Sequence, residues 1–405
     1  MMAEKIVLAY SGGLDTSVAI RWLKEDRGYD VIALTVDVGM DRSREELESR
    51  ALAAGAVKYV WREAQEEFAR HFVFPAVMAG ARYQGVYPLA TALSRPLIAR
   101  EMVEVARAEG ATAVAHGCTG KGNDQVRIDV SVQALAPELM IVAPLREWQM
   151  DRESEIDYAA EHKIPISVTK KSPYSIDENL YGRSIETGPL EDPWTEPPED
   201  VWQWTKSPAD APDETAYIEI GFESGAPVSL DGEATAPVNL LQALNEMAGE
   251  HGVGRIDTIE DRLVGIKSRE VYEAPAGMTL LAAHEAIESL TLGKEQRRFK
   301  ARVAQEYADL VYNGLWFSAH HQDLQAYVES TQRHVSGTVR VKLNKGAATA
   351  VGRKSPQSLY DFSLATYDKA DQFDRTAAVG FISIWGLPVK VQAQAQLLDE
   401  EKRPH

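Results

Sequence analysis

The residues of this chain that could do chemistry begin with a glycine- and hydroxyl-rich stretch near the N-terminus, SGGLDTS at 11–17. An apolar run typical of a buried strand precedes it, and apolar residues at helical i,i+4 spacing follow. Where a strand turns directly into a helix, the first backbone N–H groups of the helix are unpaired and carry its positive dipole end. Because Gly12 and Gly13 permit a sharp bend and close approach, the stretch predicts a phosphate-binding loop. The alternative is an ordinary glycine turn with Asp15 or Thr16 capping the helix.

A second polar stretch, AHGCTGKGNDQVRID, holds three glycines followed by amide, carboxylate and guanidinium side chains. Asn123 and Arg127 are four residues apart, so on a helix they share a face and can together hold a carboxylate and an amide-like group. Asp124 either orients a ligand amine or only caps that helix. We interpret His116 as structural, since His116, Cys118 and Asp124 lack the spacing of metal ligands. No neighbouring base identifies Cys118 as a nucleophile.

The elements that must position these residues alternate between strand-like and helix-like segments through the first 165 residues. Strands are predicted at 5–10, 30–37, 57–60, 112–116 and 139–143, with a long helix at 96–109. This alternation predicts βαβ units that form a parallel sheet covered on both faces. Ligands of such sheets bind at the carboxyl ends of the strands, where the loops SGGLDTS, DVGMDRS and HGCTGKGND all open.

The second half of the chain has a different pattern, which predicts an α+β domain. Between Pro189 and Pro212 stand six prolines and three tryptophans, so an irregular excursion is expected there. Because no basic cluster accompanies the tryptophans, we expect them to pack against the domain rather than to stack on bases. Further predicted elements are hairpins at 216–230 and 337–352, a helix at 238–249 and mostly helical structure at 278–330. The polar tail from Val389 is either an arm that packs on a neighbouring subunit or a frayed terminus.

The composition limits the classes of function. The 405 residues are 44% hydrophobic and 26% charged, and no apolar run approaches the ~20 residues that span a bilayer, so we expect no membrane partner. With 43 basic and 61 acidic residues, the formal net charge of −18 disfavours nucleic acid as a partner. The single cysteine excludes an intrachain disulfide, and the first strand begins at once, with no room for a cleavable signal. We therefore expect a cytoplasmic protein.

Five motifs together point to a family. SGGLDTS fails both the GxxxxGK[ST] and the GxGxxG patterns, and instead resembles the pyrophosphate loop of enzymes that split ATP between its first two phosphates. HGCTGKGNDQVR, YSIDENL, HGVGRID and GIKSREVYEAPAG follow in this order. The set resembles the argininosuccinate synthase family over essentially the whole chain, and TGKGNDQVR is its most specific member.

The resemblance implies a fold and a reaction. The fold is α/β: a Rossmann-like pyrophosphate-loop ATP-binding domain at 1–165, an α+β synthetase and multimerisation domain at 166–385, and a C-terminal oligomerisation tail at 386–405. The reaction joins citrulline to aspartate through a citrullyl-adenylate, giving argininosuccinate, AMP and pyrophosphate for arginine biosynthesis. ATP is a substrate, Mg²⁺ bridges its phosphates, and no metal site of the protein's own is implied. The resemblance also implies a homotetramer.

The resemblance assigns site residues by position. The ATP-binding positions are Ala9, Tyr10, Ser11, Gly12, Gly13, Leu14, Asp15, Thr16, Ser17, Val36 and Gly117. The citrulline-binding positions are Tyr87, Ala92, Asn123, Arg127, Ser175, Ser184, Glu260 and Tyr272. The aspartate-binding positions are Thr119, Asn123 and Asp124, and Asp124 is the catalytic candidate.

Some positions depart from the family pattern. Ala92 stands where a citrulline-binding serine is expected, so Thr91, Ser94 or the backbone must serve that place. Val36 is bulkier than the usual small residue, Glu270 replaces a glycine, and DVGMDRS replaces a Gly-Gln sequence. These departures leave an inactive ATP-binding relative as an alternative. A tRNA thiolase and a glutamine amidotransferase are opposed by the single cysteine, and the thiolase also by the acidic charge.

Overall fold

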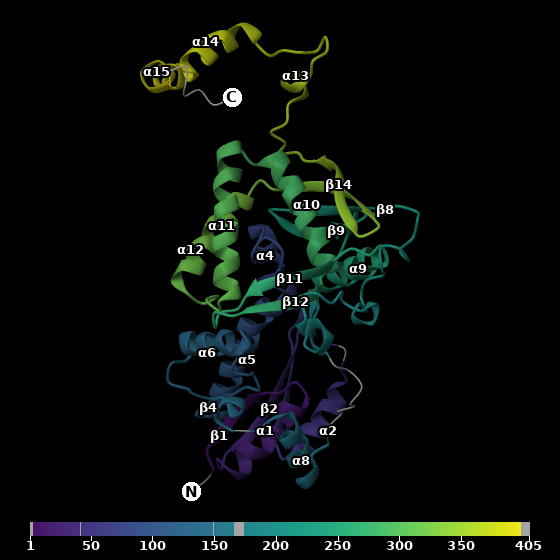
Figure 1. The fold of residues 1–405 in the computed structure, drawn as a ribbon, viewed down its shortest axis with the longest axis vertical. Helices are drawn as coiled ribbons and strands as arrows, with labels where there is room; N and C mark the ends of the chain where they lie inside the picture. The colour runs from purple at the N-terminus through teal and green to yellow at the C-terminus, as the bar shows by residue number, and fades with distance from the viewer. Residues whose placement is uncertain (1–2, 41, 149, 166–173, 398–405) are drawn as a thin grey trace. The chain divides into compact units, whose positions relative to one another are not determined.

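The computed structural model describes residues 3–40, 42–148, 150–165 and 174–397 (Figure 1). The chain forms two compact units, Met1–Gln357 and Ser358–His405. The predicted boundary between residues 165 and 166 falls at the edge of a segment outside the described residues. The predicted boundary between 385 and 386 lies inside the second unit.

The first unit contains the predicted parallel sheet. Its strands are β1 (Lys5–Ala9), β2 (Asp30–Asp37), β3 (Lys58–Glu63), β4 (Ala113–Ala115) and β5 (Met140–Val142). All neighbours are parallel, in the order β3-β2-β1-β4-β5. The five predicted strands are therefore confirmed. The strand order reverses between β1 and β4, which is where open α/β sheets bind ligands.

Helices cover both faces of this sheet, because successive strand residues point to opposite sides. Ile6 and Leu8 of β1 share a buried cluster with α1 (Leu14–Glu25) and α2 (Arg44–Ala54). Val7, between them, belongs to the cluster that contains α5 (Ala90–Glu109) and α6 (Asp124–Leu135). The short α7 (Pro144–Glu147) and α8 (Arg152–Glu161) both pack against α1.

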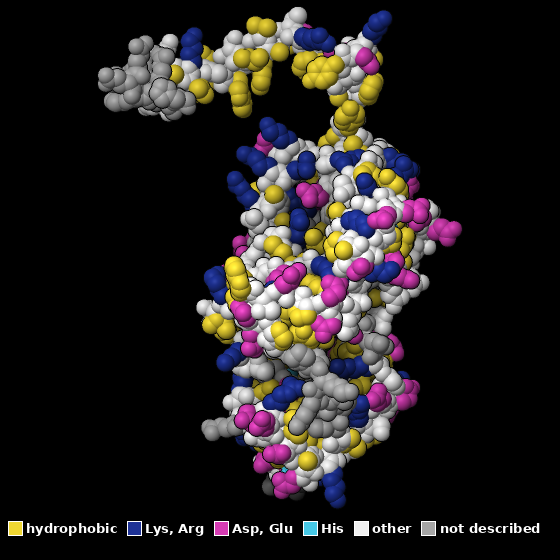
Figure 2. All heavy atoms as spheres, turned by 45° about the vertical axis from the view of Figure 1, so that its right-hand side comes forward, with side chains coloured by type: hydrophobic (Ala, Val, Ile, Leu, Met, Phe, Trp, Pro, Cys, Tyr) yellow, Lys and Arg dark blue, Asp and Glu magenta, His cyan; other side chains and the backbone are white. Residues whose placement is uncertain are grey.

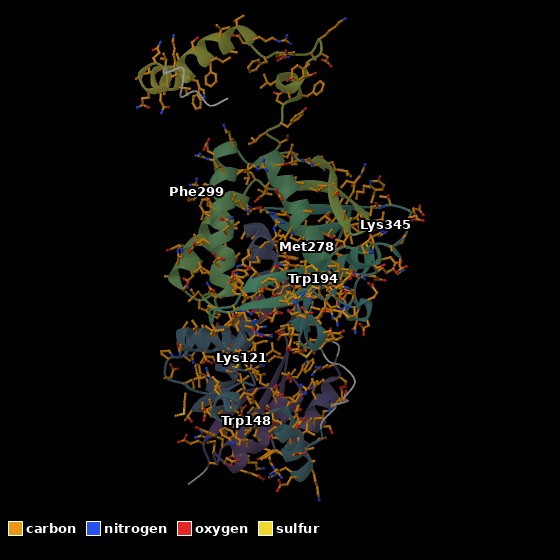
Figure 3. All side chains as sticks on the ribbon, viewed as in Figure 1. Lys121, Trp148, Trp194, Met278, Phe299 and Lys345 are labelled. Atoms are coloured by element: carbon orange, nitrogen blue, oxygen red, sulfur yellow. The ribbon has the colours of Figure 1, made fainter. Side chains whose placement is uncertain are left out.

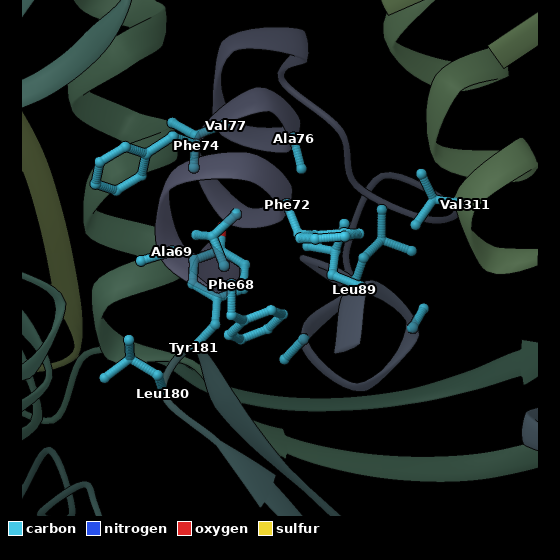
Figure 4. Close-up of a cluster of buried hydrophobic side chains, with 14 of the residues drawn as sticks. Phe68, Ala69, Phe72, Phe74, Ala76, Val77, Leu89, Leu180, Tyr181 and Val311 are labelled. Carbon is cyan, nitrogen blue, oxygen red and sulfur yellow. The ribbon is translucent and has the colours of Figure 1, made fainter. Parts of the chain in front are cut away.

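One segment of the N-terminal half packs into the C-terminal half. It comprises α3 (Gln65–Phe68), a π-helical turn at Ala69–Val73 and α4 (Phe74–Ala79). Figure 4 shows Phe68 and Phe72 of this segment in one buried cluster with Tyr181 and Val311. The two sequence halves therefore share a hydrophobic core.

The rest of the first unit is α+β, as predicted. The sheet β11-β12-β7-β6 is formed by β6 (Ser175–Asn179), β7 (Gly182–Glu186), β11 (Arg255–Asp261) and β12 (Lys267–Glu273). The sheet β10-β9-β8-β13-β14 is formed by β8 (Ala216–Glu223), β9 (Ala226–Leu230), β10 (Glu233–Ala234), β13 (Gly337–Asn344) and β14 (Ala347–Lys354). The helices are α9 (Pro237–Glu250), α10 (Pro275–Thr291), α11 (Lys294–Tyr312) and α12 (Ala319–Gln332). The predicted hairpins and helices of this half are confirmed.

The proline-rich excursion is irregular, with only short 3-10 turns at Gly188–Glu191 and Glu199–Val201. The guanidinium group of Arg255 lies over the ring of Trp202, with Cζ 4.8 Å from the ring centroid. Trp194, labelled in Figure 3, is 95% exposed, so the expectation that all three tryptophans pack against the domain is wrong for this one.

The second unit contains α13 (Phe362–Ala365), α14 (Arg375–Trp385), α15 (Leu387–Gln392) and a π-helical turn at Ala393–Leu397. The helices α13, α14 and α15 bury no residue, and Figure 2 shows hydrophobic side chains exposed along this unit. The tail predicted from the sequence is thus only the end of a longer segment, and the earlier part carries most of the apolar side chains. Residues 398–405 of that tail lie outside the described residues.

Candidate active site

The carboxyl edge of the parallel sheet opens onto a cavity of about 690 Å³. The loops after β1, β2 and β4 contribute to one wall, and one face of the β11-β12-β7-β6 sheet contributes to another. The predicted convergence of three loops at this edge is therefore confirmed, and the cavity also brings in side chains from the C-terminal half.

The opening loop leaves the N-terminus of α1 free for an anion. Gly12 has a left-handed φ of +74°, and a Cβ there would lie 2.2 Å from Leu47 Cδ2, so only glycine fits. Gly13 is the N-cap residue and supplies no side-chain capping bond. The alternative in which Asp15 or Thr16 caps the helix is therefore wrong, and the first N–H groups remain available to a ligand.

The loop after β4 comes close to this first loop. A Cβ on Gly117 would lie 2.7 Å from Thr16 Cγ2, so the glycine permits the approach. His116 Nε2 lies 2.7 Å from Asp129 Oδ1, and its Nδ1 accepts the Cys118 backbone N–H at 3.1 Å. Both ring nitrogens hold the loop in place, which supports the structural interpretation of His116. Burial raises the pKa of the Cys118 thiol, so this group is a poor nucleophile.

The sheet wall is polar because alternate residues of its strands face the cavity. Asp177 pairs with Ser184, and Ser184 pairs with Tyr272, so three strands place these side chains in one row. The cavity-lining residues of this face are Ser175, Asp177, Ser184, Glu186, Glu260, Glu270 and Tyr272.

A buried carboxylate lies deep in the cavity. Glu260 is 3% exposed and accepts hydrogen bonds from the hydroxyls of Tyr272, at 2.7 Å, and Tyr312. Tyr312 in turn accepts a bond from Asn123 Nδ2 at 2.7 Å, and Tyr87 stacks on Tyr272 with ring centroids 4.0 Å apart. Burial raises the pKa of Glu260, and the two tyrosine hydroxyls only partly oppose this effect. A cationic group entering the cavity would stabilise the ionised carboxylate.

Arg127 has an unused donor beside this carboxylate. Its Nε donates to the Tyr312 carbonyl at 2.9 Å, and its Nη1 donates to Asp124 Oδ1 at 2.9 Å. Its Nη2 is buried and has no hydrogen-bond partner among the residues that the structure describes. Since a buried guanidinium N–H without an acceptor is costly, this atom fits the carboxylate of a ligand.

Asp124 is held by two guanidinium groups. Besides Arg127, Arg95 Nη2 donates to its Oδ2 at 2.7 Å. Burial alone would raise the pKa of Asp124, but the two arginines outweigh it and lower the pKa to about 2. The N-cap residue of α6 is Asn123 and its side chain makes no capping bond, so the interpretation of Asp124 as a helix cap is wrong.

Residues 5–165 match the Arginosuccinate synthase N-terminal HUP domain, and residues 174–392 match the Arginosuccinate synthase C-terminal domain. The chain belongs to the argininosuccinate synthase family. It is 58% identical to the argininosuccinate synthase of Dehalococcoides mccartyi strain 195 over 402 aligned residues, and this alignment covers 99% of each chain. It is 57% identical to that of Symbiobacterium thermophilum (98% of this chain, 99% of the relative) and 56% identical to that of Listeria monocytogenes HCC23 (97% of each). A tRNA thiolase and an inactive ATP-binding relative are not favoured.

The structure brings most residues assigned from the argininosuccinate synthase resemblance to one cavity. Those that line it are Ala9, Tyr10, Ser11, Asp15, Thr16, Val36, Tyr87, Gly117, Thr119, Asn123, Asp124, Arg127, Ser175, Ser184, Glu260 and Tyr272. Gly12, Gly13, Leu14 and Ser17 belong to the loop or to α1 but are outside this lining. Ser17 is buried and its hydroxyl lies 3.3 Å from the Tyr10 hydroxyl.

Ala92 does not reach the cavity. It is fully buried in the hydrophobic core, so its assignment as a citrulline-binding residue needs correction. The preceding residue, Thr91, lines the cavity and its hydroxyl forms a short hydrogen bond with that of Ser184. Of the two side chains considered from the sequence as replacements, Thr91 lines the cavity and Ser94 does not.

Several cavity residues were not found from the sequence of this argininosuccinate synthase family member. Arg42 and Arg95 lie on the N-terminal side, and Asp177, Glu186 and Arg262 on the sheet side. The alternating polar residues of YSIDENL were an available signal for Asp177. Arg95 gave no such signal, because only the packing of α5 against β6 and β7 places it in the site.

Proposed function

We propose that this chain catalyses the ATP-dependent ligation of citrulline with aspartate, giving argininosuccinate, AMP and pyrophosphate. The ureido oxygen of citrulline attacks the α-phosphorus of ATP, and the aspartate amine then displaces AMP from the adenylate. The single observation that supports the proposal beyond family membership is one cavity lined both by the glycine loop after β1, through Ser11 and Thr16, and by Arg127 and Glu260. This juxtaposition suits two successive steps on a shared intermediate.

Citrulline binds between Arg127 and Glu260. The free Nη2 of Arg127 takes the α-carboxylate, and the buried carboxylate of Glu260 takes the α-ammonium group. Tyr87, Ser175, Ser184 and Tyr272 complete the pocket, with Thr91 in place of the expected serine. Aspartate binds at Thr119, Asn123 and Asp124, next to Arg127 on the same helix end.

ATP binds where the opening loop meets Val36 and Gly117. Its phosphates lie at the free N-terminus of α1, and apolar side chains of β2 provide a surface for the adenosine. A Mg²⁺ ion bound with the nucleotide would supply positive charge to its phosphate oxygens. Among the described residues no group of three or more His, Cys, Asp or Glu side chains is placed to hold a metal ion, and Asp15 is a carboxylate of the opening loop that lines the cavity.

We propose a cytoplasmic homotetramer that uses the second unit for assembly. The exposed hydrophobic side chains of that unit support assembly, and the net charge of −18 argues against a nucleic-acid partner. Within the described ranges, no helix is long and apolar enough to cross a membrane.

The test is pyrophosphate release from ATP, Mg²⁺, citrulline and aspartate, with each omitted in turn. The complete mixture should give continuous release together with argininosuccinate, and omission of aspartate should leave at most one turnover. Release that does not depend on citrulline would contradict the proposal.

A further inference from the structure

Arg95 joins two carboxylates that come from different parts of the chain. It lies on α5, and its Nη2 donates both to Asp124 Oδ2, on α6, and to Asp177, on β6. Its Nη1 donates to the Ser94 hydroxyl at 3.1 Å. Arg95, Asp124 and Asp177 all line the cavity, so the guanidinium group fixes both carboxylates at its wall.

The two carboxylates differ in how fully they are paired. Both oxygens of Asp124 are occupied, Oδ1 by Arg127 and Oδ2 by Arg95, so this group is an anchor that accepts protons poorly. Asp177 has Arg95 as its guanidinium partner, and 41% of its side chain is exposed. Arg95 donates to Oδ2 of Asp177, so among the described residues Asp177 is the carboxylate of the pair that leaves an oxygen, Oδ1, available to a bound cation.

We propose that Asp177 contacts the reacting amine of aspartate and accepts its proton, and that Arg95 is a positioning residue that holds Asp177 and Asp124 on either side of that amine. This inference rests on the proposed function. It gives roles in the reaction to Arg95 and Asp177, which have none in the proposed binding of citrulline, aspartate and ATP.

The proposed step is balanced without a further reactant. The aspartate ammonium group transfers one proton to a carboxylate oxygen of Asp177, and the freed electron pair forms a bond to the former ureido carbon of the citrullyl-adenylate. The bond between that carbon and the bridging oxygen breaks, and its electron pair leaves with AMP. The second proton on the same nitrogen passes to the departing phosphate as the guanidinium group forms.

The charged surroundings of Asp177 suit a proton acceptor. Although 41% of its side chain is exposed, the surrounding cavity walls partly desolvate the Asp177 carboxylate and raise its pKa. Arg95 from α5 opposes this effect, whereas Asp124 from α6 and Glu178 from β6 add to it, so the pKa of Asp177 lies above its ordinary value. Cys118, from the loop after β4, is a further titratable neighbour, and its thiol is neutral because burial raises its pKa. In the unaltered enzyme, the rate of the second step should therefore fall at low pH as Asp177 becomes protonated. Removing the carboxylate should change this acid limb of the pH–rate profile.

The test is Asp177→Asn in the full chain, with rapid-quench mixing of enzyme, ATP, Mg²⁺ and citrulline followed by aspartate. The citrulline-dependent burst of pyrophosphate should persist, while argininosuccinate formation falls by about 10²- to 10⁴-fold, the usual loss when a general base is removed. The acid limb of the second step should disappear. Asp177→Glu, which keeps a carboxylate, should recover part of the rate.

Three results would overturn the inference: a near-normal second step, an unchanged acid limb, or a lost burst in a variant with normal thermal unfolding. Asp157→Asn, on the exposed side of α8, is the matched control and should behave as the unaltered enzyme. If the unaltered enzyme itself gives no citrulline-dependent burst, the proposed function fails and not only this step.

Arg95→Lys tests the positioning role. It keeps the charge but cannot bridge two carboxylates through one planar guanidinium group, so we expect the KM for aspartate to rise and the second step to slow. The pyrophosphate burst with citrulline should be retained. A uniform loss of both steps with a lower thermal midpoint would instead show a purely structural role and overturn this part of the inference.

Discussion

Gly12 and Gly13 are neighbours with different requirements. Gly12 has a left-handed φ and no room for a Cβ, whereas Gly13 has a φ of −77° and its nearest atom to a Cβ would be Ser11 Oγ at 3.5 Å. We therefore expect Gly13→Val to keep the fold and to abolish ATP binding, because the side chain would crowd the N–H groups of α1. Titration calorimetry with ATP and a thermal melt measure the two effects. Gly12→Ala is the contrasting control and should lower the melting temperature.

Glu260 makes citrulline binding depend on pH. Because burial raises its pKa, the group becomes protonated at a higher pH than an ordinary glutamate, and the protonated form cannot pair with an ammonium group. We expect the affinity for citrulline to fall as pH drops through this pKa. In Glu260→Gln the affinity should be low at all pH values, and a variant that binds citrulline as tightly as the unaltered enzyme would contradict the assignment.

Glu270 should make the stability of the fold depend on pH. Its pKa is raised to about 7, first by burial and then by Glu186, although Arg262 donates to it at 2.6 Å. A carboxyl group with a raised pKa favours the folded state at low pH, and this contribution is lost as pH rises from about 4.5 to about 7. This loss of stability amounts to at most about 3.5 kcal/mol, at about 1.4 kcal/mol per pH unit. Urea unfolding at pH 5 and pH 7.5 should show a smaller difference for Glu270→Gln, and an equal difference would exclude Glu270 as the source.

Individual site residues could be predicted only where they belong to a motif, or where the two-residue alternation of a strand places them on one face of a sheet. Arg127 and Asn123 share a helix end as their spacing indicates, and Ser184 and Tyr272 share a sheet face. Ala92 shows the limit, since its position along the chain suggested a pocket residue whereas the rotation of α5 places Thr91 there instead. Which residue of a helix reaches a cavity depends on packing that one sequence does not specify.

At the scale of elements, the strands were predictable because each is a short apolar run between turn signals. Their order was not, since the crossing between β1 and β4 depends on long-range packing. The segment at 65–79 was also missed as a link between the halves. Its apolar residues fit an ordinary covering helix equally well, and only the structure shows that they pack into the C-terminal half.

Phe72 tests whether this segment unites the two halves. It is 3% exposed and stacks on Trp316 with ring centroids 4.8 Å apart. We expect Phe72→Ala to lower the free energy of unfolding by about 3–5 kcal/mol. Phe299, which is labelled in Figure 3, is 52% exposed, so Phe299→Ala should change the free energy of unfolding far less. Denaturant unfolding followed by circular dichroism and by tryptophan fluorescence measures both. Two separate transitions in the unaltered chain would contradict a shared core.

At the scale of the whole molecule, the two units differ in how they treat apolar side chains. The first unit buries a large core, whereas the second exposes aromatic and aliphatic side chains such as Phe381, Ile384 and Trp385, with 75% of Trp385 accessible. An isolated helix of this length is marginal in water, so its order calls for a partner surface. From the sequence, the polar tail that starts at Val389 could be either an arm or a frayed terminus, and the apolar segment at 359–387 that precedes it was not predicted.

The second unit therefore allows a graded test of assembly. Truncation after Gln357 removes every exposed hydrophobic residue of the unit, and we expect the oligomer to dissociate, because an arm docked on a neighbour contributes interface and not core. Truncation after Gln392 keeps α14 and α15 and should leave most of the assembly intact. In the full chain, Phe381→Ser combined with Trp385→Ser should weaken association without changing either end of the chain. Sedimentation velocity over a concentration series measures all three, and the same oligomer before and after truncation at Gln357 would show that the contacts lie entirely within the first unit.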